Sequence, residues 1–182
     1  PDLFGRLAKA SNAAALDAQS REALLQGARL AVQSDVAQTY FVLRALDAER
    51  ALVRETVIAY RDTLRLTERR YQAGDVAELD LARVQAEVAA TESQALALDR
   101  RRAQLEHALA VLLGELPSGF ALAEAEWRGA LPGVPAGPPS TLLTRRPDVS
   151  AAQSAMRAAQ ARVGVAQAAW FPDLALTASG GF

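Results

Sequence analysis

Three carboxylates, Asp75, Glu78 and Asp80, are the side chains of this sequence whose spacing is best suited to chemistry. Paired carboxylates act as a general acid and a general base when a cleft holds the substrate between them. No second catalytic group accompanies these three, so we do not expect an acid–base couple. Two other roles stay open. The carboxylates could cap a helix and favour its positive end, or they could form an acidic collar if several copies of the chain assemble.

The rest of the composition excludes most other chemistry. The chain has no cysteine, which rules out disulfides and thiolate sites. Its one histidine, His107, is too few for a histidine metal cluster. We expect His107 to be a packing or surface residue. A net charge of −1 at pH 7 argues against a surface that binds nucleic-acid phosphates. The sequence therefore predicts neither an enzyme nor a metal or cofactor site.

Alanine dominates the 182 residues: there are 41 alanines, whereas aromatic residues make up 5%. Large cores need bulky side chains, so this composition favours helices that pack closely along narrow seams. No stretch approaches the roughly 18 consecutive apolar residues of a membrane-spanning helix. Because the chain begins with Pro1 and ends on a short strand-like stretch, we expect it to be a piece of a longer protein.

Residues 6–73 are predicted to form one long helix. This stretch contains no proline and a single glycine, Gly27, and its apolar residues alternate spacings of three and four, which is typical of a coiled coil. A helix of this length extends on the order of 100 Å. The predicted seam consists of Leu25, Arg29, Val32, Val36, Thr39, Leu43, Leu46, Arg50, Val53, Val57, Tyr60, Leu64, Thr67 and Tyr71.

A tight turn is predicted at residues 74–75. Gly74 can adopt the left-handed conformation that ends a helix, and two arginines precede it near the negative end of the helix. Asp75 then fits the N-cap of the next helix and Glu78 its third position. A turn of one or two residues forces an antiparallel arrangement, so residues 1–113 are predicted to form a long helical hairpin.

The second helix, predicted over residues 76–113, carries two seams. A simple two-stranded coiled coil needs only one, so the second seam predicts a further helical neighbour. The first seam consists of Leu81, Val84, Val88, Thr91, Ala95, Leu98, Arg102, Leu105, Leu109 and Leu112. The second, of mostly small residues, consists of Ala82, Ala86, Ala89, Ser93, Leu96, Arg100, Ala103, His107 and Ala110.

Residues 114–146 are rich in proline and glycine and are predicted to be an irregular connector, which Trp127 could staple onto the helices. A third helix is predicted over residues 147–171, where Gly164 permits the close approach of another helix. Because the second and third helices together match the first in length, we expect them to stack end to end beside it. Residues 172–182 read as the start of a strand. The seam of the third helix consists of Val149, Ala152, Met156, Ala159, Val163, Ala166 and Trp170.

Arg29, Arg50 and Arg102 interrupt the predicted seams. They could line water inside a tunnel, or they could pair with acidic residues and set the register of the helices. Tyr71 could likewise contact a partner or pack as an ordinary seam residue. The sequence leaves these alternatives open.

Six segments, taken in order, resemble the TolC-like outer-membrane efflux proteins, in particular the lipoprotein branch that works with resistance-nodulation-division pumps. Each segment alone is a weak signal, but together they cover nearly the whole chain. The segments are 2–6 (DLFGR), 37–45 (AQTYFVLRA), 70–81 (RYQAGDVAELDL), 110–114 (AVLLG), 142–149 (LLTRRPDV) and 166–174 (AQAAWFPDL).

The resemblance implies a homotrimer in a Gram-negative bacterium, in which a β-barrel in the outer membrane continues as an α-helical tunnel in the periplasm. This all-α chain would be the first of two repeats of the tunnel wall, with residues 114–146 as an equatorial connector and residues 172–182 as the start of a barrel strand. The channel would passively export drugs or other small molecules, with energy supplied by an inner-membrane transporter.

The resemblance also implies that the hairpin tip docks a periplasmic adaptor protein. The chain departs from the family at Ala77–Glu78, where members usually carry a serine. Two rival functions are the hairpin of an adaptor protein, whose flanking β-rich halves are missing here, and a coiled-coil scaffold, which needs only one seam. The implied docking residues are Tyr71, Gly74, Asp75, Val76, Ala77, Glu78, Leu79 and Asp80.

Overall fold

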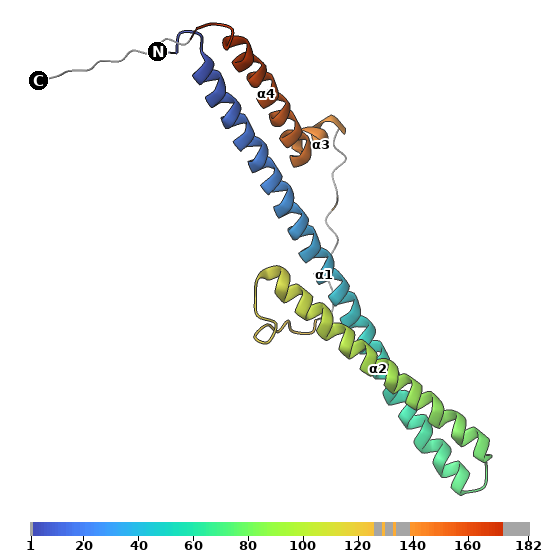
Figure 1. Cartoon of the computed structure of the whole chain (residues 1–182). Helices are drawn as coiled ribbons and strands as arrows, with labels where there is room; N and C mark the ends of the chain where they lie inside the picture. Colours follow the sequence, from blue (N-terminus) through green and yellow to red (C-terminus); the bar gives the residue numbers. More distant parts are fainter. Residues whose placement is uncertain (1, 126–128, 130–132, 134–138, 173–182) are drawn as a thin grey trace, which may run out of the picture. The chain divides into compact units, whose positions relative to one another are not determined.

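The computed structural model describes residues 2–125, 129, 133 and 139–172. Among these residues no strand occurs, and no helix combines the length and the apolar composition that crossing a bilayer requires. The predicted all-α class is confirmed (Figure 1). The helices are α1 (Arg6–Gln72), α2 (Glu78–Leu113), α3 (Pro139–Arg145) and α4 (Pro147–Ala168).

Helix α1 contributes to two separate units of the chain. Unit 1 comprises Pro1–Ala31 and Gly133–Phe182, and unit 2 comprises Val32–Pro132. This division differs from the predicted hairpin of residues 1–113, because the N-terminal part of α1 packs against α4 and only its C-terminal part packs against α2.

In unit 2, α2 runs antiparallel to the C-terminal part of α1. Arg61 pairs with Glu92 at 2.6 Å near one end of the contact, and Arg102 pairs with Asp47 at 2.8 Å nearer the other. Burial of each large apolar side chain between the helices stabilises the pair by about 1.5–3 kcal/mol. The central apolar cluster consists of Leu46, Val53 and Leu98, with Ala95 and Leu105 packed against it.

The two predicted seams of α2 behave differently. Every residue of the first seam is buried or half-buried, and the matching seam of α1 is buried or half-buried from Val36 to Thr67. Every residue of the second seam except Ala110 is exposed. The first seam is therefore the hairpin interface, and the second remains uncovered.

The predicted seam of α1 is wrong at its N-terminal end, where Leu25, Arg29 and Val32 are exposed. In unit 1, α1 packs through smaller residues. Ser20 Oγ donates a hydrogen bond to the Ala151 carbonyl at 2.9 Å, and a Cβ placed on Gly27 would lie 3.6 Å from the Cβ of Pro147. The stripe of bulky residues predicted the wrong packing face of α1, because small residues allow the two helix backbones of unit 1 to come close.

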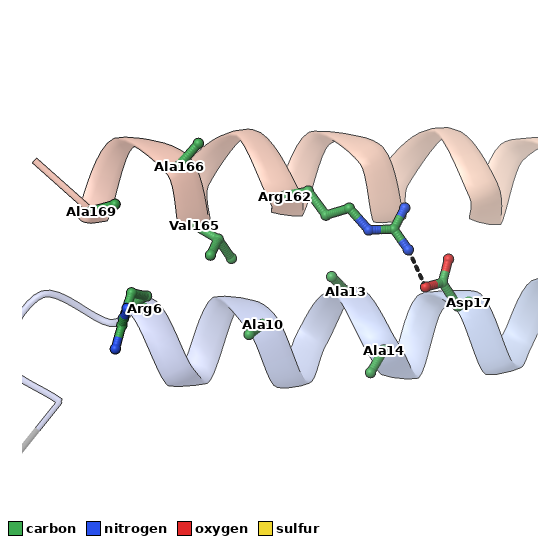
Figure 2. A pocket seen from close by; sticks show the side chains of 9 residues that line it. All are labelled: Arg6, Ala10, Ala13, Ala14, Asp17, Arg162, Val165, Ala166 and Ala169. Atoms are coloured by element: carbon green, nitrogen blue, oxygen red, sulfur yellow. Dashed lines mark hydrogen bonds and ion pairs between the residues drawn. The ribbon is translucent and has the colours of Figure 1, made fainter.

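The predicted seam of α4 is also wrong, because Val149, Met156 and Val163 are all exposed. The face that packs on α1 is instead lined with alanine, and Ala158 is fully buried. Figure 2 shows the alanine-lined groove of about 430 Å³ that this packing leaves between α1 and α4, beside the ion pair between Arg162 and Asp17.

The boundaries of the C-terminal part differ from the prediction in two places. The predicted connector contains the short helix α3, and the third helix ends at Ala168 rather than at residue 171. Pro147 lies in the first turn of α4 as predicted. Trp127 and residues 173–182, which include most of the predicted strand start, lie outside the described residues.

Candidate docking site at the hairpin tip

Gly74 determines where the hairpin of unit 2 reverses direction. Its φ is +82°, a left-handed conformation that glycine adopts without steric cost. The Gly74 N–H donates to the Tyr71 carbonyl at 2.9 Å, and the Asp75 N–H donates to the Arg70 carbonyl at 2.8 Å. These two hydrogen bonds form a Schellman motif, which satisfies the last carbonyls of α1.

The predicted capping role of Asp75 is wrong. Asp75 completes the Schellman motif of α1, and the N-cap of α2 is Ala77, whose backbone is extended and which makes no side-chain cap. The turn therefore occupies residues 73–77 instead of 74–75. Glu78 and Asp80 do lie in the first turn of α2, where the positive end of the helix favours their charge.

All eight predicted docking residues lie at this tip, in the last turn of α1, in the turn itself and in the first turn of α2. Tyr71 is 40% exposed and Leu79 61% exposed, while Val76 between them in sequence is half-buried. The three tip carboxylates are exposed. The tip thus presents apolar side chains beside solvent-exposed carboxylates.

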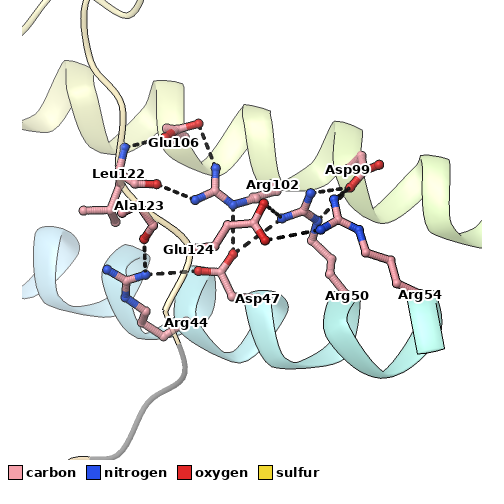
Figure 3. Close-up of polar contacts among 10 residues, drawn as sticks. All are labelled: Arg44, Asp47, Arg50, Arg54, Asp99, Arg102, Glu106, Leu122, Ala123 and Glu124. Atoms are coloured by element: carbon pink, nitrogen blue, oxygen red, sulfur yellow. Dashed lines mark hydrogen bonds and ion pairs between the residues drawn. The ribbon is translucent and has the colours of Figure 1, made fainter.

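A second polar site ties the hairpin to the connector in unit 2 (Figure 3), and the sequence indicated only that two of its arginines, Arg50 and Arg102, could pair with acidic residues. Four arginines and four carboxylates meet there, and we call them the arginine–carboxylate cluster. Its members are Arg44, Asp47, Arg50, Arg54, Asp99, Arg102, Glu106 and Glu124.

Asp47 is the buried centre of this cluster, with 6% of its surface exposed. One carboxylate oxygen accepts a hydrogen bond from Arg102 Nε at 2.8 Å, and the other accepts one from Arg44 Nη1 at 3.1 Å. Arg50 Nη1 lies 3.7 Å from the first oxygen. Asp47 therefore links two successive turns of α1 to α2.

Three consecutive connector residues are held by the cluster. The Leu122 carbonyl accepts from Arg102 Nη2 at 2.6 Å, and the Leu122 N–H donates to Glu106 Oε1 at 2.6 Å. The Ala123 carbonyl accepts from Arg44 Nη1 at 2.7 Å, and Glu124 accepts from Arg50 Nη1 at 2.9 Å. The connector is thereby fixed onto the hairpin by backbone and side-chain contacts together.

The sequence left open whether the three seam arginines line water or pair with acidic residues, and the cluster decides this for two of them. Arg50 and Arg102 pair with acidic residues, whereas Arg29 is exposed. Burial on its own lowers the pKa of Arg50, but hydrogen bonds to Asp99 and Glu124 outweigh it and the pKa is raised. The hydrogen bond from Arg50 lowers the pKa of Asp99 in spite of the opposing effect of burial. Both groups are thus held in their charged forms.

The other candidates from the sequence lie apart from these two sites. His107 is exposed on the second seam of α2. Within residues 2–125, 129, 133 and 139–172, no group of three or more histidine or carboxylate side chains is arranged to hold a metal ion. Gly164 lies in α4, where an added Cβ would come within 3.1 Å of Lys9 Cδ.

Comparisons with known proteins point to one family. The family model described as "Outer membrane efflux protein" matches residues 2–115 and 139–182. The solvent efflux pump outer membrane protein SrpC of Pseudomonas putida is 38% identical over 185 residues, and the outer membrane protein OprJ of Pseudomonas aeruginosa is 31% identical over 182. Each alignment covers 99% of this chain and 38% of the relative.

Solved structures agree with the sequence relatives. A membrane protein from Pseudomonas aeruginosa superimposes with a TM-score of 0.83 at 30% identity, over 93% of this chain and 40% of the other. The outer-membrane channel OprN superimposes with a TM-score of 0.81 at 30% identity, over 93% of this chain and 39% of the other. This chain thus spans well under half the length of the relatives it matches. It belongs to the outer membrane efflux protein family.

Proposed function

We propose that this chain is a segment of the periplasmic tunnel wall of a trimeric outer-membrane channel, which passively exports small molecules as part of a tripartite efflux pump. The observation that carries the proposal is the family match, which includes both the hairpin and the segment with α3 and α4. Relatives named for solvent, toluene and antibiotic efflux suggest organic solvents and drugs as the class of cargo.

The uncovered helix faces support a place in a wall of helices. The second seam of α2 is exposed, and so are Val149, Met156 and Val163, which repeat every seven residues along α4. A heptad spacing of apolar residues is the pattern that packs against a neighbouring helix. In a closed wall each helix has a neighbour on two sides, so these faces would be covered by other parts of the trimer.

The exposed hairpin tip would dock a periplasmic adaptor protein, which connects the channel to an inner-membrane transporter. Tyr71 and Leu79 offer apolar contact area there, and the tight turn at Gly74 lets a partner approach both helix ends. Opening would consist of a splaying of the tunnel helices at this end, with energy supplied by the transporter. No covalent bond is made or broken, so this role needs no catalytic group and no cofactor.

A charge introduced at the tip tests the docking step. In the full-length channel, Leu79→Arg should abolish adaptor copurification and raise the intracellular level of a fluorescent efflux substrate, because the arginine would be desolvated in the interface. Leu116→Arg is the control, since Leu116 is 76% exposed but lies in the connector, and it should leave both readouts unchanged. Normal adaptor binding and export by the Leu79→Arg channel would contradict tip docking.

A further inference from the structure

A pocket opens in unit 2 where the connector returns to the hairpin. Its volume is about 730 Å³, and it is lined by α1 between residues 32 and 41, by the end of α2 and by the connector. Three of the chain's ten aromatic residues (two Trp, three Tyr and five Phe) line it, namely Tyr40, Phe41 and Phe120. We call it the aromatic pocket. Sites for small molecules have volumes of about 300–1,000 Å³ and mostly apolar walls, and this pocket has both properties.

The arginine–carboxylate cluster fixes the wall that the connector contributes. Leu122 lines the pocket, and its carbonyl is held by Arg102 and its N–H by Glu106 (Figure 3). On α1, the guanidinium of Arg44 lies 5.0 Å from the centroid of the Tyr40 ring. The walls are thus in place before a ligand arrives, so binding does not have to order the connector first.

The lining disfavours charged ligands. Among the described side chains that line the pocket none is charged, because the two polar ones are Gln33 and Tyr40, whose residue types are neutral at pH 7. An ionised group that moved into the pocket would lose its hydration without gaining a partner of opposite charge. The rings favour aromatic ligands, since a well-placed ring pair improves affinity by about twofold to tenfold beyond the burial of apolar area.

We propose that the aromatic pocket binds a neutral aromatic small molecule. A cavity of about 150 Å³ lined by apolar side chains is enough to hold benzene, so the larger volume here accommodates a ligand of about two or three rings. The proposal deepens the proposed function and rests on it in one respect, which is that such compounds belong to the class of cargo. A bound ligand contacts both helices of the hairpin and the connector, and therefore stabilises their association.

Photolabelling of the full-length channel, held in an amphipathic polymer, tests the site. The probe is phenyl(trifluoromethyl)diazirine, a neutral aromatic compound that loses dinitrogen on illumination and inserts as a carbene into a neighbouring bond. We expect saturable labelling of the tryptic peptides 30–44 and 103–128, which carry the pocket residues, and an excess of naphthalene should abolish it. Naphthalene sulfonate has the same rings and a negative charge, and it should compete about tenfold more weakly.

Three variants show whether the label enters this pocket. Ala37→Phe places a ring in the pocket from an exposed position on its wall and should reduce labelling of both peptides about tenfold, because it takes up the space of the ligand. Phe41→Ala should reduce it about fivefold, because it removes one of the rings that contact the ligand. Ala48→Phe is the matched control: it makes the same change at an exposed alanine of α1 outside the pocket lining, and it should label normally.

Three results would overturn the proposal. They are no saturable labelling of the two peptides, equal labelling of Ala37→Phe and Ala48→Phe, and equal competition by naphthalene and its sulfonate. The first is the result expected if another part of the channel fills the pocket. Circular dichroism of each variant shows whether it is folded. Export is measured separately in cells that express the same channels, so a channel that exports normally without labelling removes this inference and leaves the proposed function intact.

Discussion

Replacing Asp47 by asparagine should destabilise unit 2 by about 3 kcal/mol. The substitution keeps the shape of the side chain but removes the charge from a buried site that accepts from Arg102 at 2.8 Å and from Arg44 at 3.1 Å. Each hydrogen bond to a charged group contributes about 1.5–3 kcal/mol, and breaking a buried ion pair costs about 3–5 kcal/mol. We expect the lower end of this range, because both arginines keep carbonyl oxygens of the connector as acceptors.

Urea unfolding of the chain, followed by circular dichroism, measures this change in the free energy of unfolding. The matched control is Asp62→Asn, which removes an exposed i,i+3 pair with Arg65 on the same helix and should change the stability by at most about 0.5 kcal/mol. Hydrogen exchange at the Leu122 amide should also accelerate in Asp47→Asn, since the cluster holds the connector there. If Asp47→Asn unfolds within about 0.5 kcal/mol of the unchanged chain, the cluster is not what fixes the connector.

Three further predictions concern the turns, the pH and the alanine packing. Gly74→Ala and Gly114→Ala should each lower the free energy of unfolding by about 1–2 kcal/mol, because both glycines have positive φ and open space around them, but only Gly74→Ala should weaken adaptor copurification; equal weakening by both would contradict a specific role of the tip. The lowered pKa of Asp99 means that its stabilising effect is present above its ordinary pKa of about 3.9 and is lost as the pH falls through the lowered value. The difference in Tm between the unchanged chain and Asp99→Asn should therefore shrink below about pH 4, and a difference that does not change with pH would be evidence against the ion pair with Arg50. Ala158→Leu should destabilise unit 1 by about 1–3 kcal/mol through overpacking, whereas Ala159→Leu, on the exposed face, should have little effect on thermal unfolding; similar values for the two would mean that the packed face is misassigned.

The sequence correctly predicted which face of a helix is packed where the bulky apolar residues form a single stripe with the helical period. The first seam of α2 consists largely of leucine and valine at spacings of three and four, and all of it is buried or half-buried. On α4 the same reasoning failed, because two stripes share the helical period. The bulky stripe with Met156 is exposed, and the alanine stripe with Ala158 is buried. Periodicity identifies a helix, but it does not identify which face meets which neighbour.

The connector contacts of the arginine–carboxylate cluster and the N-cap of α2 could not be predicted, for different reasons. The cluster depends on where an irregular connector returns to the hairpin, as in the contact of Arg102 with the Leu122 carbonyl, and no periodic pattern encodes that return. At the tip, an aspartate after a glycine suits both an N-cap and the last position of a Schellman motif. Gly74 and Asp75 satisfy the carbonyls of α1, and Ala77 is left as the N-cap of α2.

Photo-crosslinking from the tip tests adaptor docking most directly. A photoreactive residue would replace Leu79 in the full-length channel in cells, and a matched control variant would carry it at Leu96, which is similarly exposed but lies about 25 Å further along α2. We predict adaptor crosslinks from Leu79, and from Leu96 only crosslinks to other parts of the channel. Adaptor crosslinks of equal strength from both positions, or none from Leu79, would contradict docking at the hairpin tip.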